Sequence, residues 1–282
     1  MKKPPIPLRS ALNIAELAAS DPCDRAVVLG SFWPYSRSSF ESRLIKVFKT
    51  CSPTNDFEPH ISALARFYAG LVLDKVRYER FEWVVRVLGS AEVKPEPNRP
   101  QSLLADMVCA AAGACNATDL FFRSQSRPPM RVVDRLAGAE ALKARLHYVV
   151  QDLFLRPAEL AGSVLLLDDI ANTGASARVY AAAAKQLAGA SRVVVVNLAA
   201  TRFAAGKDGR GLLRLDTSAL ADKPALSEVW TDSAGAFHAG RDCPSIEKSA
   251  DCEVRFVAER NFRPCPDCVG RLPAGRKWWQ IP

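Results

Sequence analysis

Two apolar segments on either side of an alanine-rich segment restrict the fold of this chain more than any other feature. Ser163–Leu167 is a continuous apolar run, and Arg192–Ala200 contains four consecutive valines. Both are typical of strands buried on both faces of a sheet. Between them, the composition of Gly174–Ala188 predicts a helix. Because the links between these segments are short, the sequence predicts an α/β fold with a parallel sheet.

The segments that precede this unit also alternate between helical and strand patterns. Apolar residues recur at helical spacing in Phe57–Arg77 and in Gln101–Ala112. Between these two helices, Phe81–Leu88 is rich in β-branched and aromatic residues and predicts a strand. We also expect a helix over Ala11–Ala19 and a short strand over Asp119–Arg123.

Composition excludes several classes of protein. Hydrophobic residues make up 49% and charged residues 24% of the 282 residues, which excludes a mainly disordered or fibrous chain. No apolar run approaches the roughly 18 residues of a membrane-spanning helix, so no membrane partner is expected. The two lysines near the start are not followed by an apolar core, so we expect no signal peptide and a cytoplasmic location.

The charge of the chain favours anionic partners. The net charge is +8, from 38 Lys and Arg against 30 Asp and Glu. Phosphorylated small molecules and nucleic acid both fit this charge, which does not choose between them. The densest basic stretch, Arg123–Arg145, is interpreted either as a solvated loop and helix face or as a phosphate-facing loop.

Two adjacent carboxylates and a small polar turn follow the first apolar run. The acids are Asp168 and Asp169, and the turn with the helix start comprises Asn172, Thr173, Gly174, Ala175 and Ser176. Ligands of α/β sheets bind at the carboxyl ends of strands, and a helix N-terminus binds phosphate through its backbone N–H groups. Two carboxylates would repel a phosphate, so we expect them to face solvent and hold ribose hydroxyls or a hydrated Mg²⁺.

This segment resembles the phosphoribosyl-pyrophosphate (PRPP) motif of type I phosphoribosyltransferases. Arg99–Ala105 is similar to a region of the competence protein F-like (ComF-like) members, and the similarity covers roughly residues 30–200. The resemblance implies the parallel-sheet type I phosphoribosyltransferase fold, with PRPP and Mg²⁺ as ligands. It also implies an enzyme that releases pyrophosphate from C1 of the ribose through a cation-like transition state.

The resemblance also assigns roles to individual residues. Asp168 and Asp169 would be the catalytic acids, and the turn from Asn172 to Ser176 would bind PRPP. Gly89 and Ser90 would lie in the loop that meets pyrophosphate, and Arg123–Arg145 would be the mobile loop that closes over it.

The sequence departs from this family at two places. Where the family has Arg-Gly-Phe, this sequence has the shorter Arg99-Pro100. Where the family usually has Thr-Thr-Gly, Asn172 replaces the first threonine. In purine-salvage relatives, an aspartate near the base stands at the position of Asn172. Asparagine cannot act as a general base there, which argues against a purine-salvage reaction. The molecule that accepts the phosphoribosyl group could be a nitrogenous base, an amine or water. The alternative is a non-catalytic phosphoribosyl-ligand-binding protein or a DNA-associated accessory protein.

Four of the eight cysteines lie close together near the C-terminus, which in a reducing compartment suggests metal before disulfide. Cys265 and Cys268 form a Cys-x-x-Cys knuckle that two prolines restrict, and Cys243 supplies a third thiolate. Either His238 or Cys252 would complete a tetrahedral Zn²⁺ site. The alternative interpretation is two disulfides or unliganded thiols.

Residues 237–270 resemble the small metal-binding module of Ada-type DNA-repair proteins, because His-x4-Cys-Pro is followed by Arg-Pro-Cys-x-x-Cys. The resemblance favours His238 as the fourth ligand of a structural Zn²⁺. It leaves nucleic acid open as a partner, since such modules lie against DNA. The predicted organisation is a leader and helix (1–30), a phosphoribosyltransferase-like domain (31–205), a linker (206–236), the zinc module (237–270) and a tail (271–282).

Overall fold

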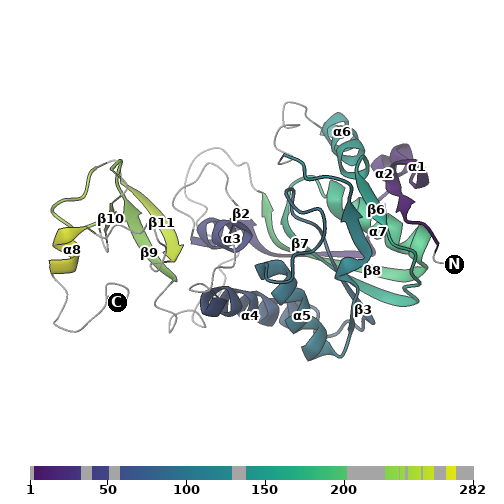
Figure 1. Ribbon diagram of the computed structural model, residues 1–282, viewed down its shortest axis with the longest axis horizontal. Helices are drawn as coiled ribbons and strands as arrows, with labels where there is room; N and C mark the ends of the chain where they lie inside the picture. The colour runs from purple at the N-terminus through teal and green to yellow at the C-terminus, as the bar shows by residue number, and fades with distance from the viewer. Residues whose placement is uncertain are drawn as a thin grey trace. The chain divides into compact units, whose positions relative to one another are not determined.

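The computed structural model of the chain describes residues 3–32, 40–50, 58–128, 138–201, 226–234, 236–238, 241–248, 250–256 and 265–270. The chain forms two compact units (Figure 1). The first comprises residues 1–29 and 68–200, and the second comprises residues 30–67 and 201–282. No helix within the described ranges combines the length and the hydropathy needed to cross a membrane.

A five-stranded sheet carries the predicted α/β alternation. Its strand order is β2-β8-β7-β3-β4, formed by Arg25–Phe32, Ala190–Thr201, Gly162–Ala171, Trp83–Arg86 and Cys115–Asn116. The pairs β7/β8, β3/β7 and β3/β4 are parallel. The two apolar runs predicted as strands lie in β7 and β8 and are buried. The α/β class with a parallel sheet is therefore confirmed.

The helix between the two apolar strands packs on the sheet through small residues. This helix, α7 (Ala175–Ala188), buries all of its alanines together with Val179 and Tyr180. The Tyr180 ring lies against the Phe121 ring, with a centroid distance of 4.3 Å. Helix α5 (Pro100–Ala112) contacts β3, and α6 (Gly138–Val150) contacts α7. Alanine side chains let α7 approach the valines of the sheet closely, which explains the composition of this segment.

The predicted helix over Ala11–Ala19 is two helices, α1 (Leu8–Ala11) and α2 (Ile14–Ala19). The break lies at Asn13, whose side chain accepts hydrogen bonds from the backbone N–H groups of Ala15 and Glu16 and so starts a new helix. The longer predicted helix between residues 57 and 77 is α4 (Glu58–Lys75), and α3 (Phe40–Thr50) precedes it.

A second, antiparallel sheet has the order β1-β6-β5, formed by Ile6–Pro7, Leu153–Leu155 and Phe121–Arg123. Of the predicted strand over Asp119–Arg123, only the last three residues form a strand, β5. Its start belongs to a single 3₁₀ turn, η1 (Thr118–Leu120). This sheet links the N-terminal residues to the segment that follows α6.

The second unit contains a three-stranded antiparallel sheet of order β10-β9-β11. Its strands are Phe237–His238, Leu226–Thr231 and Asp251–Phe256, and the short helix α8 (Pro266–Gly270) follows them. Helix α3 of the same unit contacts β11. Strand β9 falls within residues 206–236, where the sequence predicted only a linker.

Candidate functional site

Strand β7 carries both predicted acids within the sheet instead of at its end. It continues four residues beyond Leu167, and Ala171 still pairs with Ala200 of β8. Asp168 and Asp169 are consequently only 8% and 7% exposed. The expectation that both carboxylates face solvent is wrong, because hydrogen bonding to β8 extends β7 past them.

The two carboxylates leave β7 on opposite faces, because successive side chains of a strand alternate. Val164 and Leu166 belong to the core that includes α7, so Asp168, two residues further on, lies on the α7 face. One oxygen of Asp168 accepts a hydrogen bond from the backbone N–H of Asp169 at 2.9 Å. One oxygen of Asp169 accepts from the backbone N–H of Ile170 at 2.6 Å. Both side chains therefore fold back on the strand backbone.

The predicted turn lies between β7 and α7. Gly174 is the N-cap of α7 and has a left-handed backbone conformation, with φ of 74°. No side chain caps this helix end, and a Cβ built on Gly174 would meet no atom of the described residues within 4 Å. Ser176 and Thr173 are partly exposed beside it. Among the described residues, no side chain thus occupies the N-terminus of this fourteen-residue helix, the kind of helix end that suits an anion.

A buried arginine lies against this turn. Arg145 of α6 is 5% exposed, and its Nη1 and Nη2 lie 3.0 and 3.2 Å from the Asn172 side-chain oxygen, with the amide oriented to accept from them. The guanidinium therefore holds the Asn172 side chain through hydrogen bonds. It also places a positive charge next to the helix N-terminus.

Three arginines of the basic stretch make contacts inside the protein. Arg123 is buried, and Arg127 donates hydrogen bonds to the Tyr148 backbone oxygen and to the Asp152 carboxylate. Together with Arg145, these residues show that the solvated-face interpretation is wrong for this part of the stretch. The mobile-loop prediction for the centre of the stretch falls on residues 129–137, outside the described residues.

The loop after β3 contains a buried ion pair. Arg86, the last residue of β3, contacts the Glu92 carboxylate through Nη2–Oε1 at 2.6 Å and Nη1–Oε2 at 2.9 Å. The backbone N–H of Gly89 donates to the same carboxylate at 2.6 Å. Burial by itself raises the pKa of Glu92, but the hydrogen bonds and charge of Arg86 outweigh it and leave the pKa lowered.

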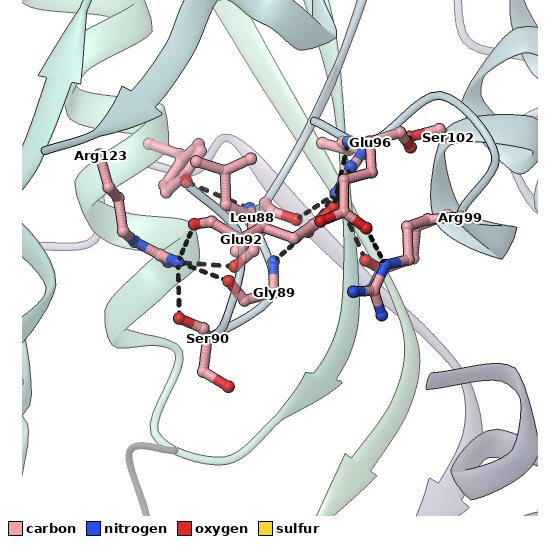
Figure 2. Close-up of polar contacts among 12 residues, drawn as sticks. Leu88, Gly89, Ser90, Glu92, Glu96, Arg99, Ser102 and Arg123 are labelled. Carbon is pink, nitrogen blue, oxygen red and sulfur yellow. Dashed lines mark hydrogen bonds and ion pairs between the residues drawn. The ribbon is translucent and has the colours of Figure 1, made fainter. Parts of the chain in front are cut away.

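Arg123 holds the carbonyl groups of the same loop, as Figure 2 shows. Its guanidinium donates to the backbone oxygens of Leu88, Gly89, Ser90 and Glu92. Two predicted pyrophosphate-loop residues, Gly89 and Ser90, therefore lie in a loop whose polar groups already have internal partners. Sequence reasoning missed Arg86 and Glu92, because charged residues are seldom buried unless they are paired and the sequence does not show this pairing. It named Arg123 only as the start of the basic stretch, without its contacts to this loop.

This loop and the turn before α7 lie at the same edge of the sheet. Strands β3 and β7 are parallel neighbours with Arg86, the last residue of β3, opposite Leu167, so both strands run toward this edge, and β7 extends four residues further. Tyr180 of α7 joins the two, since its hydroxyl oxygen accepts a hydrogen bond from the Leu88 backbone N–H at 3.1 Å. The predicted residues from both segments are thus brought to one edge, where ligands of such sheets bind.

The second unit contains the predicted metal ligands as one cluster. His238, Cys243, Cys265 and Cys268 are all buried, and their ligand atoms lie within 4.8 Å of one another. The Cys243 and Cys265 sulfur atoms are 3.7 Å apart. The side chain of Cys252, the alternative ligand, lies outside the described residues. Three thiols and an imidazole at this spacing could hold a metal ion.

The environment of Cys265 favours its thiolate. Neither Cys265 nor its neighbours Cys243 and Cys268 form a disulfide within the described part of the chain. Burial raises the pKa of Cys265, but hydrogen bonds from the backbone N–H groups of Cys268 and Asp267 and from neighbouring thiols outweigh burial and lower it. A thiolate is the form that binds metal.

Sequence reasoning missed one further residue of this cluster, Asp232. Its Oδ2 lies 3.1 Å from Nε2 of His238. Asp232 directly follows β9, and the sequence Asp-Ser-Ala-Gly that begins there is a turn signal that could have revealed it.

Comparison of the chain with protein-family models and with curated proteins found no match. The chemistry of the two sites is therefore inferred from their own residues. One site combines carboxylates with the open N-terminus of a helix, and the other combines soft sulfur and nitrogen donors.

Proposed function

We propose that the chain binds a phosphoribosyl ligand at the β7–α7 edge and acts as a phosphoribosyltransferase of the type I kind. The observation that carries the proposal is the N-terminus of α7, which has no side-chain cap among the described residues and follows, after a short turn, the central parallel strand that carries both acids. A structural metal module in the second unit accompanies this site.

The phosphate of the ligand would lie at Gly174. Gly174 has a left-handed backbone at the start of α7, and among the described residues no atom lies within 4 Å of a Cβ built there. The aligned peptide dipoles of the helix favour a negative charge at this end. The Arg145 guanidinium, bound to Asn172 of the same turn, adds a positive charge nearby.

The two acids would bind the ribose of the ligand. Each uses one carboxylate oxygen for a backbone N–H, and a carboxylate has several further acceptor sites. Asp168 and Asp169 could therefore accept hydrogen bonds from ribose hydroxyls. They could also help to hold Mg²⁺, which would neutralise the diphosphate when bound.

The reaction breaks the bond between ribose C1 and the pyrophosphate oxygen, and pyrophosphate leaves with the electron pair. A nucleophile of the acceptor then bonds to C1. The role of this chain's residues is to position the ribose and stabilise charge, since Asn172 supplies no general base. An acceptor that needs no deprotonation by the turn, such as a free amine, suits this site best.

A second candidate is a phosphoribosyl-ligand-binding protein without turnover. The observation that favours it is the Gly89 N–H, which donates to the Glu92 carboxylate instead of facing an incoming diphosphate. A site of this kind would accept a ribose 5-phosphate group and lack the pyrophosphate loop that turnover needs.

The experiment that tests the proposal measures binding of PRPP with Mg²⁺, and of ribose 5-phosphate, by calorimetry. Asp168→Asn combined with Asp169→Asn should abolish binding while circular dichroism stays that of the parent. The matched control is Asp74→Asn combined with Asp106→Asn, which removes two exposed carboxylates from the same unit. Parent-like affinity in the first double variant would show that the ligand does not bind here.

Pyrophosphate release separates the two candidates. Phosphorus NMR of the parent with PRPP, Mg²⁺ and a panel of amines and nitrogenous bases should show free pyrophosphate appearing with time. Binding without release under these conditions, water included as acceptor, would favour the non-catalytic candidate.

A further inference from the structure

The two ring nitrogens of His238 have different surroundings. Nε2 lies 3.1 Å from Oδ2 of Asp232, and both side chains are almost fully enclosed. Nδ1 is also buried and has no hydrogen-bond partner among the described residues. A buried ring nitrogen without a partner is costly unless another group satisfies it. The group available at this place is the metal ion that the neighbouring thiols would bind.

The Asp232 carboxylate is held rigidly by the turn between β9 and β10. Its second oxygen, Oδ1, accepts a hydrogen bond from the Ala236 backbone N–H at 2.8 Å. The Asp232 backbone N–H donates to the Ala236 oxygen at 3.1 Å, which closes the turn. The strands then pair with His238 opposite Trp230. The carboxylate therefore cannot turn away from the ring without breaking the turn.

We propose that Asp232 is the positioning residue of the metal centre, an inference that rests on the metal site proposed above. An ionised carboxylate only accepts hydrogen bonds, so the ring proton lies on Nε2. The lone pair of the neutral imidazole then lies on Nδ1, among the thiolates of Cys243, Cys265 and Cys268. Asp232 thereby selects the tautomer and the ring orientation that bind metal, and it does so without contacting the ion.

The test compares two amide substitutions in one turn. Asparagine has a single side-chain oxygen, so Asp232→Asn can accept from Ala236 or from His238 but not from both. The matched control is Glu247→Gln, because the Glu247 carboxylate also braces this turn, through the Ser233 backbone N–H at 3.1 Å and the Ser233 hydroxyl at 2.9 Å. Both variants remove one negative charge near the cluster, and only the first touches His238.

The readout is zinc affinity of the full-length chain, measured by competition with a chromophoric chelator under reducing conditions. We expect Asp232→Asn to bind Zn²⁺ about 10- to 100-fold more weakly than the parent. Glu247→Gln should bind within about twofold of the parent. Equal losses in the two variants would assign the effect to the turn and overturn the role of Asp232.

Nitrogen NMR of the imidazole rings gives a signature that a purely structural role would not produce. In the zinc-loaded parent, one of the three histidines should show a protonated Nε2 and a metal-bound Nδ1. Its signals are assigned by their loss in His238→Ala. In Asp232→Asn this tautomer signature should weaken or exchange.

The outcomes distinguish the positioning role of Asp232 from the existence of the metal site. Zinc binding by the parent with unchanged affinity and NMR signature in Asp232→Asn overturns the role of Asp232 and leaves the metal site intact. A parent that binds no Zn²⁺ overturns the metal site and the role of Asp232 together.

Discussion

Arg86 and Glu92 form an ion pair with side chains only 1% and 4% exposed. The pair joins the last residue of β3 to the loop that follows it, and the backbone N–H groups of Gly89 and Glu96 also donate to the carboxylate. A charge in such surroundings is tolerated only while its partner is present. The loop at the candidate ligand edge is consequently held in one conformation by charges from its own chain.

Glu92→Gln should destabilise the protein strongly, because it leaves the Arg86 charge buried without a counter-ion. The expected loss of unfolding free energy is about 3–5 kcal/mol, measured by urea denaturation. Glu96→Gln is the matched control in the same loop, since Glu96 pairs with Arg99 near the surface and its loss should cost about 1 kcal/mol or less. Equal effects of the two substitutions would contradict the buried-pair interpretation.

The same pair predicts a pH dependence of stability. The pKa of Glu92 is lowered in the folded protein, so its contribution is fully present above the unfolded pKa of about 4.3. That contribution is lost as the pH falls through the folded pKa. The unfolding free energy of the parent should therefore decline below about pH 5 more steeply than that of Glu92→Gln. Parallel pH profiles of the two proteins would refute this.

Gly174→Val should abolish binding of ribose 5-phosphate, because a branched side chain would fill the space at the helix N-terminus. Gly189→Val is the matched control: Gly189 caps the other end of α7 with φ of 77°, and a Cβ there also meets no described atom within 4 Å. Both variants carry a similar backbone strain of about 1–3 kcal/mol. Calorimetry should show loss of affinity in Gly174→Val alone.

Cys265→Ser should remove the metal and loosen the second unit while the ligand edge of the first unit stays intact. Elemental analysis of the parent, purified without chelator under reducing conditions, should find one zinc per chain. Hydrogen exchange of the segment 226–270 should rise sharply in the variant, because a metal site supplies folding free energy to a small module. Cys115→Ser, an exposed free cysteine of the first unit, is the control. Absence of stoichiometric zinc from the parent protein would contradict the proposed metal site.

The fourth metal ligand can be identified by comparing His238→Ala with Cys252→Ala. The imidazole of His238 is already within the ligand cluster, so its removal should release the metal. Cys252→Ala should retain it at one equivalent. The reverse pattern would assign Cys252 as the ligand.

Local pattern was enough to predict the elements at the centre of the fold. The apolar runs in β7 and β8 and the alanine-rich helix α7 follow from side-chain periodicity and volume, which act over a few residues. Spacing also predicted Cys243, Cys265 and Cys268 as one set of candidate metal ligands. It left His238 and Cys252 as alternatives for the fourth position, and the resemblance to Ada-type modules favoured His238, which the structure places in the cluster.

Only the tertiary structure decided how the acids and the charged residues are placed. Pairing with β8 carries β7 past Asp168 and buries it, and no pattern within β7 reports where a neighbouring strand ends. Arg86 finds its partner six residues away in a loop, and Asp232 meets His238 across a turn. These contacts depend on how the chain folds back on itself, since a charged side chain is solvated or enclosed according to the elements that pack around it.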